Sequence, residues 1–487
     1  MKYQQPIMPA CRTVCFFLLP LLALAISAMA TEAPTPPPSS STSSGHLTLR
    51  DAQETALKEN PGIRAALARV EQARARLREA SAGWWPELDL SGSGTETRLS
   101  EQAWEAARTV TRLSGGEPER TTDTFTGGLQ ASWLLFDGFY RKFNELQARY
   151  QLGSTAAARL DSQRLLLLAV AESFFNAQLA QTRVEIAAAD KAFYEKRLED
   201  ARSRYQVGAG SWGDVLNIRV QVNSAKTALL LNRRELEAAS YGLAALMGIQ
   251  EARLPDSLAL APLDQAVDLD SMEEDVEELI RTALALRPDV QGLELQVRAA
   301  DAGREMARSA FYPRLFVSGS VYGNREDDPW LAGDDFGTSL GVNLGWNLFR
   351  GGADRARVFA AEQRKREASW NLVNLRNQVA AEIRRHLALL AAAKEQVRLQ
   401  RESVELVKQN RDLAQSEYEA GAASLVRLNE AQRDLTATHG RLAQALVAYH
   451  LAKQRLQSAT GRNLQQFLPP DELSSIGKEQ KDQEQRN

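Results

Sequence analysis

Four stretches of the chain alternate between apolar and polar residues, at 88–97, 125–135, 315–323 and 336–348. In the last stretch, every second residue from Phe336 to Leu348 is large and apolar except Thr338, and glycine, serine or asparagine lies between. A period of two predicts β-strands with one apolar and one polar face. Tilted strands of about 9–11 residues cross an outer membrane. Four strands are too few for a soluble β-sandwich in a chain of this length, so the pattern favours membrane strands.

Aromatic residues stand near the ends of these stretches, where a membrane strand meets water. The predicted membrane-interface residues are Trp84, Trp85, Tyr312 and Trp330. Because the smallest outer-membrane barrels have about eight strands, four strands cannot close a channel alone. Their edges are therefore predicted to pair with other copies of the chain, and three copies would supply twelve strands.

Two long segments, 139–205 and 353–420, lack proline and contain Gly153 as their one glycine. Each predicts a helix of roughly 100 Å. A shorter helix with apolar residues at every seventh position follows each one, which is typical of a left-handed coiled coil. In the second long helix, Ile383 and Val397 belong to one apolar row, and Leu399 and Leu406 belong to another on the opposite side. Two rows predict neighbours on both flanks, as in the wall of a cylinder. A helix of a globular bundle is the alternative.

The chain repeats itself. Asn60-Pro61 corresponds to Arg287-Pro288, and Leu135-Phe136-Asp137-Gly138 corresponds to Leu348-Phe349-Arg350-Gly351. The stretch from Asn60 to Leu135 in the first copy is longer than the stretch from Arg287 to Leu348 in the second copy. This difference predicts a loop insertion within 96–123 of the first copy. The first repeat spans 46–250, with a β-hairpin at 88–135 and a helical hairpin at 139–248. A linker at 251–271 leads to the second repeat at 272–465, with hairpins at 315–348 and 353–461. A polar tail follows at 466–487.

The N-terminus has the pattern of an export signal. Lys2 and Arg12 are basic, residues 16–26 are apolar, and Ala28-Met29-Ala30 has the form of a cleavage site. The apolar run is shorter than the roughly 20 residues of a membrane anchor. A signal peptide at 1–30 and a flexible leader at 31–45 are therefore predicted. The two cysteines of the chain, at positions 11 and 15, leave with the signal. No cysteine stands at the cleavage site, so no lipid anchor is predicted.

Composition excludes several other functions. The chain has 59 Lys and Arg against 62 Asp and Glu and no basic stripe, which argues against nucleic-acid binding. Its four histidines lack metal-ligand spacing, and no nucleophile elbow or phosphate-binding loop occurs. We therefore predict no catalytic residue, metal or cofactor. The acidic run at 264–278 is interpreted as a solvated surface segment.

Several motifs together resemble the TolC-like outer-membrane efflux proteins over about residues 46–465. They are the paired helix starts, the strand exits LLFDG and NLFRG, and the sequences RYQVGAGSWGDVLN and EYEAGAASLVRLNEAQRDL. The resemblance implies an α+β membrane protein, a homotrimeric channel with a twelve-stranded β-barrel and a long α-helical coiled-coil barrel. It implies a location in the outer membrane, with the helical barrel in the periplasm. It also implies docking to a periplasmic adaptor and an inner-membrane ABC or proton-driven transporter.

The resemblance places functional residues at the two helical turns, hereafter the tips. The implied adaptor-docking residues are Val207, Gly208, Gly421 and Ala422. The implied residues of the periplasmic aperture are Asp214, Tyr418, Arg427 and Glu430. Arg427 replaces a carboxylate of the family, and Ala423 replaces a basic residue. We therefore expect Arg427 to form a salt link with Asp214 or Glu430.

Together with these patterns, the resemblance implies a passive exit duct of a tripartite export system that lies against outer-membrane lipid. One alternative is a periplasmic coiled-coil scaffold without a pore. Another keeps the duct and changes its partner, from type I protein secretion to a drug or metal efflux pump. The missing lipidation cysteine favours the secretion members.

Overall fold

The computed structural model describes residues 46–112, 119–255, 259–267, 269 and 275–468. The predicted signal peptide, the leader and most of the tail lie outside these residues. The first half contains β1 (His46–Leu47), α2 (Leu49–Glu59), α3 (Pro61–Ala82), β2 (Glu87–Arg98), α4 (Glu101–Arg112), β3 (Thr121–Phe136), α5 (Tyr140–Gln206) and α6 (Trp212–Leu246). The second half contains β4 (Ala259–Leu260), α7 (Val276–Leu286), α8 (Pro288–Arg308), β5 (Arg314–Glu326), β6 (Phe336–Gly345), α9 (Ala353–Glu419), α10 (Leu425–Ala459) and α11 (Arg462–Gln465).

Four strands form one antiparallel sheet in the order β2-β3-β5-β6. The central pair, β3 and β5, joins the two halves of the chain. The strands lie where the alternation predicts them, but the fourth ends at Gly345 and not at Leu348. Gly345 is opposite Arg314, the first residue of β5. Residues 346–348 therefore extend past the start of the neighbouring strand and have no partner strand in their own chain.

The insertion predicted within 96–123 contains a helix, α4, which the sequence did not predict. The segment EQAWEAARTVTR is rich in glutamate and alanine, which favour helix, and Glu101 lies at the positive end of the helix dipole. The hydroxyl of Ser100 accepts a hydrogen bond from Ala103 N at 3.3 Å and caps the first turn. The second repeat has only a short 3₁₀ turn at the same place, Gly333–Asp335.

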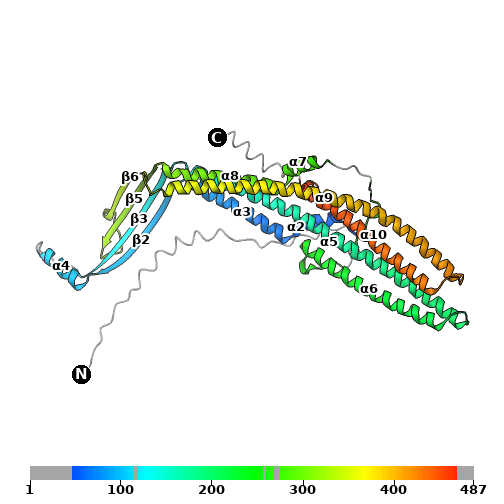
Figure 1. Ribbon diagram of the computed structural model, residues 1–487. Coiled ribbons are helices and arrows are strands. Elements are labelled where there is room, and N and C mark those ends of the chain that lie inside the picture. The colour runs from blue at the N-terminus through cyan, green and yellow to red at the C-terminus, as the bar shows by residue number, and fades with distance from the viewer. Residues whose placement is uncertain (1–45, 113–118, 256–258, 268, 270–274, 469–487) are drawn as a thin grey trace, which may run out of the picture. The chain divides into compact units, whose positions relative to one another are not determined.

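The helices α5 and α9 have 67 residues each, or roughly 100 Å. Figure 1 shows the strands at one end of these helices and the tips at the other. Next to the sheet, neighbouring helices follow the order α3-α5-α8-α9. Next to the tips, the order is α6-α5-α10-α9. Most residues of the seven-residue rows on α6 and α10 are buried, among them Val215, Val222, Leu229, Leu428 and Leu435.

Between sheet and tips, each return helix ends against a helix junction of its own repeat. Asn60 Nδ2 donates to the carbonyl of Leu246 at 2.8 Å, and the Arg287 guanidinium donates to the carbonyl of Ala459 at 3.1 Å. Gly248 has φ +76°, and a side chain there would lie 2.6 Å from the backbone of Glu59. The two repeats therefore use the same joint with different residues, which fixes each return helix to the junction of the two shorter helices of its own repeat.

Candidate functional site: sheet faces and helical tips

The sheet has one apolar and one polar face, as the strand register shows. The apolar face carries Leu88, Leu90, Leu129, Trp133, Val317, Val321, Leu340, Val342 and Leu344. It is uncovered in the single chain: Leu90 is 85% exposed and Leu340 is 82% exposed. An exposed apolar surface that extends across four strands is unsuited to water and suited to lipid.

The opposite face is polar and built mainly from small residues. Its hydroxyl groups hydrogen-bond across strands, Ser93 with Thr126 and Ser320 with Ser339, each at 2.8 Å. Asn343 Nδ2 donates to the Ser318 hydroxyl at 3.4 Å. Glycines and small polar side chains leave space for water along this face, as in the wall of a water-filled channel.

The predicted membrane-interface aromatics lie at both ends of the sheet. Trp84, Trp85 and Tyr312 lie at the helical end, and Trp330 lies in the β5–β6 loop at the other. Trp84 is held in place, because its Nε1 donates to Glu145 at 3.0 Å and the Arg141 guanidinium stacks on its ring. Two further aromatics, Trp346 and Phe349, are 58% and 83% exposed at the helical end. Neither residue was predicted as a membrane-interface aromatic, although Trp346 continues the alternation of the fourth strand.

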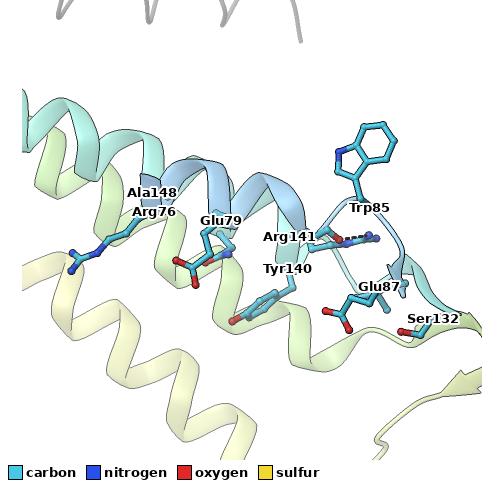
Figure 2. Close-up of a pocket in the computed structure, with 12 residues that line it drawn as sticks. Arg76, Glu79, Trp85, Glu87, Ser132, Tyr140, Arg141 and Ala148 are labelled. Atoms are coloured by element: carbon cyan, nitrogen blue, oxygen red, sulfur yellow. Dashed lines mark hydrogen bonds between the residues drawn. The ribbon is translucent and has the colours of Figure 1, made fainter. Parts of the chain in front are cut away.

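A buried ion pair fixes the angle between the sheet and α5. Arg141 Nε lies 3.0 Å from Asp137 Oδ2, and both side chains are less than one-tenth exposed. The same guanidinium donates to the carbonyls of Gly83 and Leu135. A cavity of about 650 Å³ lies beside this pair, lined by residues of α3, the sheet and α5 (Figure 2). Its wall includes Glu87 and Ser132, so it continues the polar face of the sheet.

Each tip is a tight helix-to-helix reversal. Gly208 has φ +77° and Gly421 has φ +76°, a region that glycine enters without steric cost. After each glycine, an alanine N–H returns to the helix: Ala209 N donates to Arg204 O and Ala422 N donates to Glu417 O, each at 2.8 Å. Val207 is 78% exposed, so the first tip presents an apolar side chain to solvent.

The predicted aperture residues lie within one turn or a few turns of the tips, on different helices. Tyr418 packs against the apolar cluster between the two helical hairpins, and the Arg204 guanidinium stacks on its ring at 5.4 Å. Asp214 is in the first turn of α6, and Glu430 is exposed on α10. Within the chain, the expected salt link is not formed. Arg427 Nε instead lies 3.4 Å from Glu417 Oε2, across the second tip.

Comparisons with known proteins decide the family. The family model for outer membrane efflux proteins matches residues 53–249 and 279–462, one segment in each predicted repeat. The chain belongs to the outer membrane efflux protein family. Members of this family are transport channels of the outer membrane, so this efflux protein is an outer-membrane channel protein and not an enzyme.

Two curated relatives and one set of crystal structures are similar over most of this efflux protein. The cation efflux system protein CusC of Escherichia coli O157:H7 is 26% identical and covers 84% of the chain and 85% of its own length. The solvent efflux pump outer membrane protein SrpC of Pseudomonas putida is 27% identical, with 80% of each chain covered. The crystal structures of CusC match with a TM-score of 0.72 at 23% identity, over 85% of this chain and 92% of that one.

The efflux protein also has a buried charge cluster that the sequence analysis did not select. Arg287 binds Asp289 through two nitrogens, at 2.7 and 3.1 Å, and Glu382 at 2.7 Å. Arg164 lies 3.9 Å from the same Asp289 and also pairs with Asp161. The cluster connects α5, α8 and α9. Its only sequence signal is Arg287 where the first repeat has Asn60.

Two further observations concern the described residues as a whole. None of their helices combines the length and apolar character needed to cross a bilayer. Nor do three metal-ligating side chains converge anywhere in 46–468 outside the gaps in that range. The partly buried His450 takes part in packing, because its ring stacks on that of Phe175 at 5.0 Å, and burial lowers the pKa of its imidazole.

Proposed function

We propose that three copies of this efflux protein form a passive exit duct across the outer membrane and into the periplasm. The observation that carries the proposal is the four-stranded sheet, which is apolar on one face, polar on the other and open at both edges. Joining β6 of one copy to β2 of the next would hide every edge, place the apolar face toward lipid and leave a polar lumen. Twelve strands are enough to enclose an open channel.

The helices support closure by the same neighbours. The sheet begins with β2 and ends with β6. The row of helices next to the sheet begins with α3 and ends with α9, and the row next to the tips begins with α6 and also ends with α9. In every layer, one edge therefore belongs to the second repeat's final strand or long helix, and the other edge belongs to the first repeat. A rotation that joins one pair of edges joins all three, as a ring of identical subunits requires.

The outer side of α9 supplies an apolar stripe for such a contact. Ala361, Val379 and Val397 follow one another at intervals of about five helical turns and are all buried against the chain's own helices. Trp370 and Leu406 each follow a member of this row by about two and a half turns, and so lie on the opposite side. They are 71% and 59% exposed.

The exposed side of α6 carries a matching set, which includes Val220 and Leu231, at 59% and 64% exposed. Leu231 of α6 and Leu399 of α9 each lie roughly 30 Å along their helix from the tip end, so the two are at the same height above the tips. The second apolar row predicted on α9 therefore has a partner of suitable position in the next copy.

We propose that the tips dock a periplasmic adaptor that is joined to an inner-membrane transporter. An exposed Val207 beside the ring pair of Tyr205 and Trp212, whose centroids are 5.1 Å apart, offers an apolar contact at the end of the helical hairpin. The names of the relatives, a cation efflux system protein and a solvent efflux pump protein, favour a pump of small molecules or ions over type I secretion.

The sheet also indicates a register for closure. Setting Glu87 of β2 opposite Asn347 of the next copy uses all of β2 and gives the unpartnered residues 346 and 347 a partner strand. It places Leu88 beside Trp346 and Leu90 beside Leu344, so that every apolar residue remains on the apolar face. Ser91 is then opposite Asn343 of the neighbour on the polar face.

A disulfide test exploits this register, because the only cysteines of the chain are at positions 11 and 15. We expect the double variant Ser91→Cys/Asn343→Cys to form covalent trimers after mild oxidation in the outer membrane. Within one chain β2 and β6 are three strand spacings apart, about 14 Å, which is too far for a disulfide. Denaturing gels under non-reducing conditions read the result.

The matched control is Ser91→Cys/Ser339→Cys, in which the second thiol is displaced by about 13 Å along β6. It should remain monomeric on the same gel. Covalent trimers from the control and not from the first pair would contradict the register and leave the ring intact. Monomers from both pairs, with a protein that is also monomeric by native mass, would contradict the duct itself.

A further inference from the structure

Tyr322 is the most exposed aromatic residue of the polar sheet face. Most of its neighbours are glycine, serine, threonine, asparagine or glutamine, but Tyr322 in the middle of β5 carries an aromatic ring and is 58% exposed. The residues directly opposite it on both neighbouring strands are glycines, Gly128 on β3 and Gly337 on β6. No side chain therefore stands directly opposite the ring on either neighbouring strand.

The Tyr322 ring does not cover Gly337 in the way that other aromatic rings of the sheet cover glycines. On the apolar face, the Phe125 ring covers Gly94 and the Phe336 ring covers Gly323, at 3.0–3.3 Å from a Cβ placed on each glycine. Aromatic cover of this kind protects a glycine in a strand. A Cβ on Gly337 would meet only the backbone oxygen of Tyr322, at 3.9 Å. The Tyr322 ring thus stands away from Gly337, and among the described residues no ring contact or hydroxyl partner holds it.

The surroundings of Tyr322 favour cations. The polar face carries three acidic residues, Glu87, Asp89 and Glu326, against one basic residue, Arg314. A second aromatic side chain, Phe316, lies on the same face of β5 nearer the helical end and is 39% exposed. Aromatic faces attract cations and stack on flat rings.

We propose that Tyr322 is a transient binding site for aromatic cations within the lumen of the exit duct. The inference rests on the proposed function, because only a closed barrel turns the polar face inward. Three copies place three tyrosines at one height, in a barrel that measures about 24 Å between opposite strands. Each ring offers a stacking surface to a passing substrate while the glycines beside it leave the wall clear.

A first measurement tests the position of the side chain. Purified trimers of Tyr322→Cys and of its neighbour Val321→Cys are placed in planar bilayers and treated with the water-soluble thiol reagent sulfonatoethyl methanethiosulfonate. We expect the reagent to change the current through Tyr322→Cys channels and to leave Val321→Cys channels unchanged, because Val321 faces lipid. The reverse pattern would contradict the inward polar face, and with it the proposed function.

A second measurement tests binding. Tetraphenylphosphonium is the aromatic cation probe, and tetrabutylammonium is its aliphatic counterpart. We expect Tyr322→Ser to weaken block by tetraphenylphosphonium about two- to fivefold, the size of an exposed cation–π contact. Tyr322→Phe should retain the block, and tetrabutylammonium should block all three channels equally. If the serine variant binds tetraphenylphosphonium as well as the parent does, the binding site is refuted, even where thiol labelling confirms an inward Tyr322.

Discussion

At the scale of single residues, the buried charges around Arg287 hold the two repeats together. The Arg287 side chain is 5% exposed and forms ion pairs with two carboxylates, Asp289 of α8 and Glu382 of α9. The pKa of Glu382 is lowered to about 2 by His386, whose Nε2 lies 3.7 Å away, and by Arg287, against the opposing effect of burial. A cluster of this kind is costly to break, because removing one partner leaves a buried charge unpaired.

The lowered pKa predicts a pH dependence of stability. Glu382 titrates near 4.5 when unfolded and near 2 when folded, so its carboxylate stabilises the fold fully above pH 4.5 and loses that effect as pH falls toward 2. We expect Glu382→Gln to be less stable than the parent at pH 7, by about 2 kcal/mol once partial solvent screening is included, and the difference to vanish near pH 2. Thermal unfolding followed by circular dichroism at several pH values measures it.

The exposed pair of Glu395 with Arg398 provides the control, since both side chains are at least half exposed. Glu395→Gln should shift stability little at any of these pH values. A Glu382→Gln variant whose deficit stayed constant from pH 7 to pH 2 would show that the carboxylate is not the group that matters.

At the scale of elements, α9 has two apolar sides and only one of them is used within the chain. An amphipathic helix normally buries a single stripe. The second stripe, which includes Trp370, Leu399 and Leu406, lies on solvent-exposed surface that a neighbour would cover. A ring of subunits explains why this second stripe is regularly spaced and why it is exposed in the single chain.

Replacing Leu406 should therefore weaken the trimer and spare the chain's own fold. We expect Leu406→Ser to cost about 1–2 kcal/mol at each subunit contact, because its half-exposed side chain would be buried there. Leu389 is also half exposed but lies about 100° around the helix, off the stripe, so Leu389→Ser is the matched control. Semi-native gels give the temperature at which trimers dissociate. An equal fall for both variants would argue against a seam at Leu406.

At the scale of the whole molecule, the sheet and the tips are separated by the length of α9, roughly 100 Å. The sheet contains the residues suited to lipid, and the tips contain the exposed residues suited to a protein partner. A single chain thus carries both contacts of the proposed exit duct at opposite ends of one helix. This separation lets each contact be tested without disturbing the other.

The partner is identified best at the second tip. We expect Ala422→Cys, crosslinked in living cells, to capture a periplasmic adaptor together with an inner-membrane efflux pump, as identified by mass spectrometry. Glu367→Cys, roughly 80 Å along α9, should capture neither. An adaptor found with an ABC secretion transporter would assign the duct to protein secretion. Capture of nothing by a trimeric Ala422→Cys would contradict docking at the tips.

Much of this architecture is predictable from sequence because its signals are periodic. The strand alternation located β2 and β3 within a few residues, and the lack of glycine and proline located α5 and α9 within one. The end of β6 was harder to predict from the sequence. Trp346 and Leu348 continue the alternation, although they lie beyond the first residue of the neighbouring strand β5 and are not paired with it. Within the chain, Arg427 pairs with Glu417 across the tip, a contact that the sequence did not reveal because Glu417 precedes the glycine turn and gives no periodic signal.

The helix α4 and the Arg287 cluster were missed for a different reason. Short helices and buried ion pairs depend on single residues, such as Ser100 at a cap or Asn60 exchanged for arginine between repeats. Such substitutions resemble ordinary surface variation until the fold brings their partners together. The tips were found because two glycines at matching places are required by their positive φ angles.

The open edges of the sheet have a genetic consequence. If a finished barrel needs three chains, a defective chain that still folds enters the same rings as its normal counterparts. In a cell that makes both in equal amounts and mixes them freely, about one ring in eight contains no defective chain. A tip variant that assembles yet cannot dock would therefore act dominantly over the normal gene, whereas a variant in which neither the β2 edge nor the β6 edge can pair would be recessive.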